Sequence, residues 1–230
     1  MMELSSLEQK LGTRFKNKQL LEQAFIHRSY LNENRDFHLP HNERLEFLGD
    51  AVLELVVTEH LYNERPHKPE GELTAWRAAL VNTKMLASIG KELDFSSYLR
   101  LSHGEAKEEG KARDYILANT VEAFIGAVYL DQGLKSAEKF IITYVLSKLP
   151  QVLKEKLFLD SKSHFQEVAQ EKVAITPSYS VLKEWGPDHA KNFKIGVYLE
   201  KELAGEGQGS SKQEAEQDAA RNALTNKNWN

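Results

Sequence analysis

The strongest constraint on this chain is an acidic stripe in the segment HNERLEFLGDAVL, residues 41–53. In a helix, Glu43, Glu46 and Asp50 fall within about 60° of one another. A solvated helix face is the ordinary explanation for such a stripe. However, like charges at i,i+4 repel by a few tenths of a kcal/mol, and no lysine at helical spacing relieves Glu46 and Asp50. Gly49 also costs about 1 kcal/mol against alanine inside a helix, so its presence predicts the close approach of another backbone.

A second segment, ILANTVEAFIGAVYL at residues 116–130, repeats this pattern. Asn119, Glu122 and Gly126 lie at i, i+3 and i+7 in an otherwise apolar helix, and no basic neighbour in that helix pairs with Glu122. Two glycine-bearing helices can pack closely and gather oxygen ligands that suit a hard cation, Mg²⁺ or Mn²⁺. Such a cation supports phosphodiester hydrolysis. The predicted ligands are Glu46, Asp50, Asn119 and Glu122.

Composition limits the remaining chemistry. The 230 residues include no cysteine, so neither a disulfide nor a thiolate metal site is expected. The scattered histidines do not predict a zinc site. The net charge of −4 does not by itself predict nucleic-acid binding, so any polyanion must meet a local patch. We expect no signal peptide and no membrane span.

Hydrophobic periodicity divides the chain into two parts. Residues 3–150 read as almost entirely helical. An amphipathic helical segment is expected at 17–33, a helix with a possible break near Gly90 at 73–93, and a last helix ending at Pro150. After residue 157 the pattern becomes helix, three strands and helix, with the third strand losing its order in glycines. Ser211 and Glu214 fit a capping box at the start of the last helix. The segment 149–162 is the expected joint, containing a short linker.

These motifs resemble those of the ribonuclease III family. ERLEFLGDAVL is similar to the family signature, and PEGELTAWRAALVN and ILANTVEAFIGAVYLDQG follow in the family's order and spacing. The tail resembles the family's double-stranded RNA-binding domain through PSYSVLKEWGPDHAKNF and GEGQGSSKQEAEQDAARNAL. The resemblance covers nearly the whole chain. It implies an all-α endonuclease and dimerisation domain at 1–157, followed by a small α+β domain of α-β-β-β-α order at 161–228.

The resemblance also implies an activity. We expect an Mg²⁺-dependent endoribonuclease, with Mn²⁺ as a substitute, that cuts double-stranded RNA and leaves 5′-phosphate and 3′-hydroxyl ends with a short 3′ overhang. The enzyme would be a cytoplasmic homodimer with two sites in one valley and would process ribosomal and messenger RNA precursors. No membrane association and no small-molecule cofactor are expected.

The resemblance assigns roles to individual residues of the first part. Glu46, Asp50 and Glu122 match the metal-binding and catalytic carboxylates. Asp50 would help to position the water and the metal, and Glu122 would be the indispensable ligand. Glu43 and Glu70 match outer acidic positions that face the RNA.

Two further positions of the signature segment are read differently. Phe47 matches an aromatic residue that inserts into the partner subunit, although spacing alone fits an ordinary core phenylalanine equally well. Glu54 has no catalytic counterpart and is expected to be solvated or structural.

Asn119 departs from the family pattern, in which this position is usually aspartate. An asparagine carbonyl can still bind a cation or a metal-bound water, but the site loses one negative charge and metal affinity should fall. Retained activity is the favoured interpretation because the other carboxylates are all present. The alternative is a non-catalytic double-stranded RNA-binding protein with a weakened metal site. A third alternative is a helical interaction protein with solvated acidic faces, which the glycine-carboxylate helices argue against.

The tail is not basic, since residues 161–230 hold nine Lys and Arg against ten Asp and Glu. A small α/β interaction module is therefore an alternative to RNA binding. The resemblance favours recognition of A-form shape through two minor grooves and the phosphates between them. The residue after Lys212 is Gln213, where the family usually has a second basic residue, so we expect weak and salt-sensitive binding. The RNA-binding residues it implies are Gln166, Glu167, His189, Ser211 and Lys212.

Overall fold

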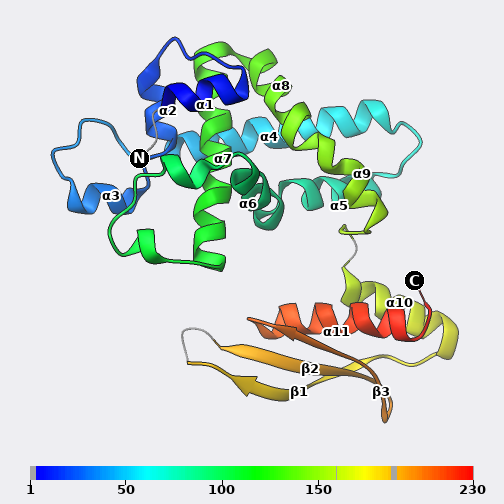
Figure 1. Cartoon of the computed structure of the whole chain (residues 1–230). Coiled ribbons are helices and arrows are strands. Elements are labelled where there is room, and N and C mark those ends of the chain that lie inside the picture. The colour runs from blue at the N-terminus through cyan, green and yellow to red at the C-terminus, as the bar shows by residue number, and fades with distance from the viewer. Residues whose placement is uncertain (1–3, 159, 188–190, 230) are drawn as a thin grey trace. The chain divides into compact units, whose positions relative to one another are not determined.

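The computed structural model describes residues 4–158, 160–187 and 191–229, which form two compact units, Met1–Phe158 and Leu159–Asn230 (Figure 1). The first unit is helical. Its α-helices are α1 (Leu4–Leu11), α2 (Lys18–Ala24), α3 (Arg28–Glu33), α4 (Glu43–Glu64), α5 (Glu70–Val81), α6 (Thr83–Glu92), α7 (Lys111–Gln132), α8 (Leu134–Tyr144) and α9 (Leu149–Lys154). Short 3₁₀ turns lie at Phe95–Tyr98, Glu105–Lys107 and Leu146–Lys148.

The long helices α4 and α7 pack against each other in the core of this unit. Both contribute to one continuous cluster of buried apolar side chains. At its aromatic centre, the rings of Phe25 and Phe124 lie 5.1 and 5.4 Å, respectively, from the ring of Phe95. Because α4 and α7 carry the predicted carboxylates, this packing positions the candidate site.

The expected helix at 17–33 is two helices, α2 and α3. Ile26 forms a β-bridge with Arg100, and the Nδ1 atom of His27 accepts a hydrogen bond from the backbone N–H of Ser29, so His27 caps α3. The expected helix at 73–93 is likewise divided. Asn82 is extended, with ψ 158°, and its side chain accepts a hydrogen bond from the N–H of Met85 to start α6.

At two positions where a helix was expected to break or end, Gly90 and Pro150, the structure shows neither. Gly90 is buried inside α6, where a Cβ atom would lie 3.3 Å from the Cβ of Leu117, so this glycine permits close packing on α7. Pro150 does not end a helix. It occupies the first turn of α9, where a missing N–H has no consequence.

The second unit contains α10 (Ser161–Val173), β1 (Ser178–Trp185), β2 (Asn192–Leu199), β3 (Glu202–Gly209) and α11 (Lys212–Asn226). The strands form an antiparallel sheet in the order β1-β2-β3, and both helices lie on one face of it (Figure 1). The α-β-β-β-α order predicted from sequence is confirmed.

The glycines of β3 do not weaken the strand as expected, since pairing with β2 continues to Gly209. Instead they allow α11 to lie directly on β3. A Cβ atom on Gly205 would lie 2.6 Å from the backbone nitrogen of Ala223, and one on Gly209 would lie 2.6 Å from that of Ala215. A Cβ on Gly207 would overlap the backbone of Ala219. Glycine at every second strand position therefore faces alanine at every fourth helix position.

The predicted cap of α11 is present in a shifted form. The Oγ atom of Ser211 accepts a hydrogen bond of 3.2 Å from the N–H of Glu214. The Glu214 carboxylate accepts from the N–H and the hydroxyl of Ser210, one residue before the predicted partner.

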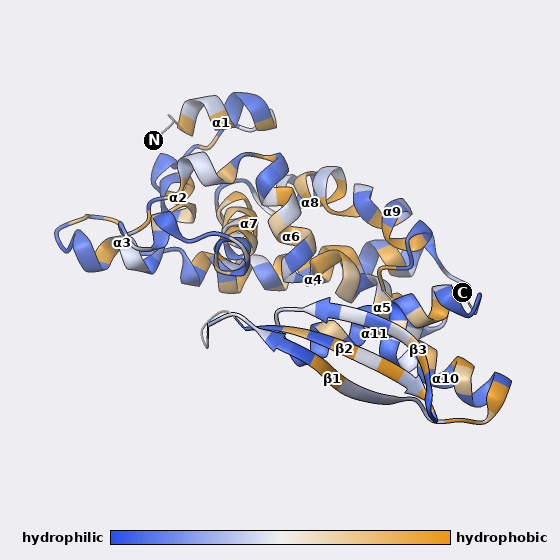
Figure 2. Ribbon diagram, turned by 60° about the horizontal axis from the view of Figure 1, so that its bottom comes forward, coloured by the Kyte–Doolittle hydropathy of each residue, from blue (hydrophilic) through white to orange (hydrophobic). Residues whose placement is uncertain are grey.

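None of the helices in the described part of the chain has both the length and the apolar character that a bilayer crossing requires. Figure 2 shows how hydrophilic and apolar residues are distributed over the helices and strands.

Candidate functional site

The predicted close contact between two glycine-bearing helices is present. A Cβ atom on Gly49 of α4 would overlap the carbonyl of Glu122 and lie 2.8 Å from the backbone nitrogen of Gly126 on α7. A Cβ atom on Gly126 would overlap the carbonyl of Leu45. The two backbones therefore touch at the level of the predicted carboxylates, and only glycine fits at either contact point.

This contact brings the predicted ligands into one electrostatic group. Burial, followed by the nearby charges of Asp50 and Glu46, raises the pKa of Glu122 to about 8. Burial and the charges of Glu43 and Asp50 also raise the pKa of Glu46, while a hydrogen bond from the Asn119 side chain acts in the opposite direction. Glu46, Asn119 and Glu122 are partly buried and Asp50 is exposed. The structure thus brings Glu46, Asp50 and Glu122 within electrostatic reach of one another and places Asn119 beside Glu46.

These carboxylates lack positive partners. Within the described ranges, no ion pair includes Glu46, Asp50 or Glu122. Glu43, in contrast, lies 3.6 Å from Arg28 and 3.7 Å from His41.

Arg28 and His41 were missed by sequence reasoning. The pairing of Arg28 with Glu43 links α3 to the start of α4, so no helical spacing reveals it. Glu54, expected to be solvated or structural, pairs with Arg77 of α5 at 2.9 Å. Glu43 and Glu54 of α4 are therefore paired with basic side chains, whereas Glu46 and Asp50 of the same helix are not paired with any among the described residues.

The residues present fit a hard cation that leaves part of its coordination to water. The residues described in the structure include no group of three or more His, Cys, Asp or Glu side chains placed to hold a metal ion. A closed cage of carboxylates is thus absent from them. Mg²⁺, however, is usually held by one or two carboxylates and keeps several waters. Half-buried carboxylates with raised pKa values and no basic partner are the groups that such a cation would stabilise.

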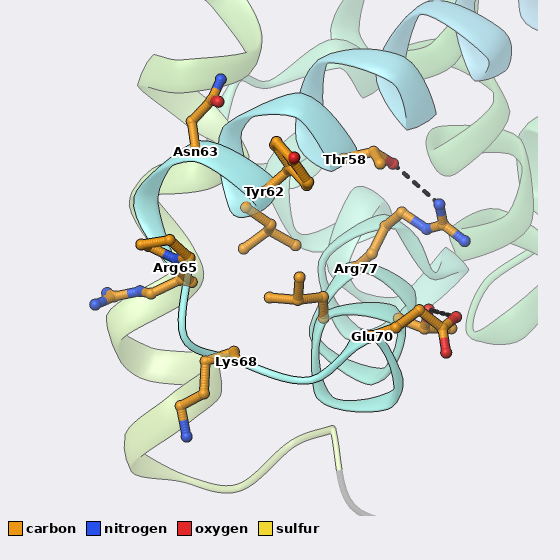
Figure 3. A pocket seen from close by; sticks show the side chains of 11 residues that line it. Thr58, Tyr62, Asn63, Arg65, Lys68, Glu70 and Arg77 are labelled. Carbon is orange, nitrogen blue, oxygen red and sulfur yellow. Dashed lines mark hydrogen bonds between the residues drawn. The ribbon is translucent and has the colours of Figure 1, made fainter.

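Glu70 lies apart from this group, in a pocket of about 580 Å³ between the C-terminal half of α4, the loop after it and α5 (Figure 3). Its carboxylate accepts a hydrogen bond of 3.0 Å from the hydroxyl of Thr74. Arg77, on the same wall, donates to the Thr58 hydroxyl at 3.0 Å (Figure 3). Leu61, Tyr62 and Leu73 supply the apolar part of the lining. The pocket is amphipathic and contains none of the residues in the carboxylate group.

Phe47 is not a core residue. Its exposed fraction is 81%, the highest among the large apolar residues in the described ranges. Leu55 and Tyr62, at 55% and 72% exposed, follow on the same side of α4 at helical spacing. The interpretation of Phe47 as a core residue is therefore wrong, and its contact with a partner subunit stays a prediction.

The predicted RNA-binding residues of the second unit occupy exposed positions. Gln166 and Glu167 lie on α10, and Ser211 and Lys212 lie at the start of α11. His189 falls outside the described residues. The Nζ atom of Lys212 lies 3.8 Å from Glu184 of β1 and 5.7 Å from the ring centre of Phe193 of β2.

Glu184 and Phe193 were also missed by sequence reasoning. They are paired across β1 and β2, and therefore approach Lys212 only once the sheet is formed.

Comparison with known proteins matches both units. The Ribonuclease-III-like family matches residues 17–149, and the Double-stranded RNA binding motif matches residues 161–227. Ribonuclease 3 of Enterococcus faecalis is 46% identical over 220 residues, covering 96% of this chain and 95% of its own length. Ribonuclease 3 of Oceanobacillus iheyensis is 45% identical, covering 97% of each chain.

A solved structure supports the fold of the first unit. The nuclease domain of ribonuclease III from Campylobacter jejuni aligns with a TM-score of 0.58 at 38% identity, covering 64% of this chain and 99% of that one. That nuclease domain shows structural flexibility in a region involved in dimer formation. Family matches in both units, a full-length relative at 46% identity and the shared helical fold lead to one conclusion: the chain belongs to the ribonuclease III family.

Proposed function

We propose that this protein is an Mg²⁺-dependent endoribonuclease that hydrolyses both strands of double-stranded RNA. The observation that carries the proposal is the group of half-buried carboxylates on α4 and α7, with raised pKa values and no positive partner. The products are 5′-phosphate and 3′-hydroxyl ends with a short 3′ overhang. Precursors of ribosomal and messenger RNA in the cytoplasm are the proposed substrates, with Mn²⁺ able to replace Mg²⁺.

Glu46, Asp50, Asn119 and Glu122 would hold the cation, which supplies an activated water and stabilises the leaving oxygen when bound. Glu122 and Glu46 provide partly desolvated charge, and burial strengthens their interaction with a cation. Asp50 is more exposed, so its carboxylate is the one best placed to orient a water at the mouth of the site. The Asn119 amide contributes a neutral oxygen and holds the Glu46 carboxylate.

The two units have different proposed roles. Residues 1–157 form the catalytic and dimerisation domain, and residues 161–228 form the double-stranded RNA-binding domain. Gln166 and Glu167 of α10 meet ribose hydroxyls, and His189 enters the next minor groove. Ser211 and Lys212 meet phosphates at the positive end of α11. With acidic residues outnumbering basic ones in this unit, binding is weak in each chain and gains from the presence of two copies.

The homodimer is proposed to form through α4. In this arrangement two copies of α4 run antiparallel, related by a twofold axis near Leu55. Phe47 lies about two turns before Leu55 and Asn63 about two turns after it, so Phe47 of one copy lies opposite Asn63 of the other. Asn63 and Tyr62 line the 580 Å³ pocket, so the exposed Phe47 ring of each copy can fill the pocket of the other (Figure 3). Glu70 lines the same pocket. This contact would therefore place Glu70 of one copy near the start of α4 in the other copy. Glu43 and Glu70 then act as outer acidic residues that face the RNA.

The test is cleavage of a long RNA duplex by the full chain, with and without Mg²⁺, beside Glu122→Gln. We expect Mg²⁺-dependent cutting by the wild type and a loss of activity of at least a hundredfold in Glu122→Gln, with RNA binding retained. Glu59→Gln, which changes an exposed glutamate elsewhere on α4, is the matched control and should cut normally. Cleavage that is indifferent to Mg²⁺ or to Glu122 would contradict the proposal.

Asn119 supports a second candidate, a protein that binds double-stranded RNA without cutting it. The same assay separates the two. Duplex binding without cleavage by the wild type, together with cleavage by Asn119→Asp, would establish the non-catalytic function.

A further inference from the structure

The sheet of the second unit has one face without a covering element among the described residues. Along β2, Ile195 and Val197 are fully buried beneath α10 and α11, and Lys194 and Tyr198 therefore point to the opposite side. Register places Lys183 opposite Lys194 and Leu203 opposite Tyr198. The outer sheet face, as we call it, includes Leu182, Lys183, Trp185, Lys194, Tyr198 and Leu203. The register also places polar residues on this face: Ser178, Ser180, Asn192, Glu206 and Gln208.

The apolar and aromatic side chains of this face gather around Gly196 and at the end of β1. Atoms of Leu182, Tyr198 and Leu203 lie between 2.9 and 3.2 Å from where a Cβ atom of Gly196 would stand, so they close over this glycine. Leu182 and Leu203 nevertheless remain 41% and 45% exposed, and the Trp185 indole is 38% exposed at the end of β1. The face thus offers an apolar patch over Gly196, with polar side chains beside it and a tryptophan at one end.

The charge on this face is unbalanced toward the positive. Lys183 and Lys194 are direct cross-strand partners, an arrangement of like charges that destabilises a sheet. Lys194 pairs with Glu206 at 2.5 Å. Lys183 has no acidic partner in the described ranges, and its Nζ atom lies 5.9 Å from the ring centre of Trp185. An anionic group beside Trp185 would relieve the repulsion between the two lysines.

We propose that the outer sheet face binds an unpaired RNA strand that continues from the duplex. Bases inside a duplex are stacked on each other, whereas unpaired bases are free to stack on aromatic side chains. An aromatic platform beside a free cation is the combination that binds single strands without sequence preference. Trp185 stacks on a base and Lys183 meets a neighbouring phosphate. Tyr198 lies six residues along β2 from the partner of Trp185, so the face spans about 20 Å.

This inference rests on the RNA binding proposed above, and it adds a preference for duplexes with single-stranded flanks. The test measures the dissociation constant of the full chain, in EDTA, for a labelled blunt duplex and for the same duplex with a single-stranded 3′ pyrimidine extension. We expect the wild type to bind the extended RNA about fivefold or more tightly than the blunt one, the effect of one stacked base. Trp185→Ser should abolish this preference, and Trp185→Phe should retain part of it.

Two controls separate the face from general effects. Lys183→Gln should reduce the preference, whereas Lys201→Gln, an equal charge change in the turn after β2, should not. Binding of the blunt duplex should be unchanged in Trp185→Ser, which shows that the domain remains folded.

The inference is overturned if the wild type shows no preference, or if Trp185→Ser retains it. It is also overturned if Trp185→Ser alters only the sedimentation of the protein, because the face would then join copies of the chain. Failure of the proposed function is distinct from all of these, since it would appear as no cleavage of the blunt duplex by the wild type.

Discussion

Glu122 shows how burial alters a carboxylate at the position proposed above for a cation. Its carboxylate sits on a largely apolar helix, and burial is the first cause of its raised pKa, ahead of Asp50 and Glu46. At neutral pH Glu122 is therefore protonated for most of the time, and a cation bound as proposed would displace this proton.

The first prediction concerns this proton. With its pKa at about 8, Glu122 carries more proton in the folded chain than in the unfolded chain from about pH 4.5 to pH 8. Its contribution to stability is therefore present at low pH and falls as pH rises through this window. The melting temperature of the metal-free wild type should drop more between pH 5.5 and 8 than that of Glu122→Gln. Equal pH dependence of the two proteins would show that Glu122 does not hold the proton.

The second prediction concerns Asn119. Asn119→Asp replaces a hydrogen-bond donor to Glu46 with a like charge, so the pKa of Glu46 should rise further and the metal-free protein should melt at a lower temperature at pH 8. Mg²⁺ should bind more tightly because the site gains a negative ligand. Calorimetric titration measures the affinity, and Asn32→Asp on the exposed surface of α3 is the charge-matched control. Unchanged affinity would place Asn119 outside the cation site.

At the scale of elements, the contact between α4 and α7 was predictable because each helix carries a glycine close to a predicted carboxylate ligand. The carboxylate spacing, the strands of the second unit and the Ser211 cap were also readable from periodicity and capping rules. The break at Asn82 could also have been predicted, because asparagine is a common residue at the start of a helix. The break at His27 could not, since it depends on a bridge to Arg100, which is distant in sequence.

The third prediction tests the helix contact. Gly49→Ala should destabilise the first unit by about 1–3 kcal/mol, because the overlap with the Glu122 carbonyl outweighs the gain in helix propensity of about 1 kcal/mol. Gly71→Ala is the control, since this helical glycine has no atom within 4 Å of a Cβ position and should be neutral or slightly stabilising. Chemical denaturation measures both. A neutral Gly49→Ala would mean that the helices separate at no cost.

For the whole molecule, net charge was a poor guide to function. The chain is acidic overall, yet one of its two units matches an RNA-binding motif. The pairing of Glu43 with Arg28, and that of Glu54 with Arg77, could not be predicted because each joins two different helices. These pairs decide which acidic residues remain available to a cation.

The fourth prediction concerns assembly. Phe47→Ser should shift the protein from dimer to monomer in sedimentation experiments at micromolar concentration, because the most exposed apolar side chain of α4 would no longer fill the partner's pocket as proposed. Tyr115→Ser on α7, at a position 59% exposed, is the control and should leave the dimer intact. A Phe47→Ser protein that remains dimeric would move the interface away from this end of α4.

The contact of Gly49 with the Glu122 carbonyl has a consequence for mutational tolerance. When every residue is replaced by every other, substitutions at 49 and 126 should reduce function as strongly as substitutions of the carboxylates. Neither glycine has a side chain that could take part in chemistry. Ranking residues by intolerance would therefore mistake them for reactive groups. Chemical rescue by small carboxylic acids distinguishes the two classes, because it can restore a truncated glutamate but cannot restore a missing space between two backbones.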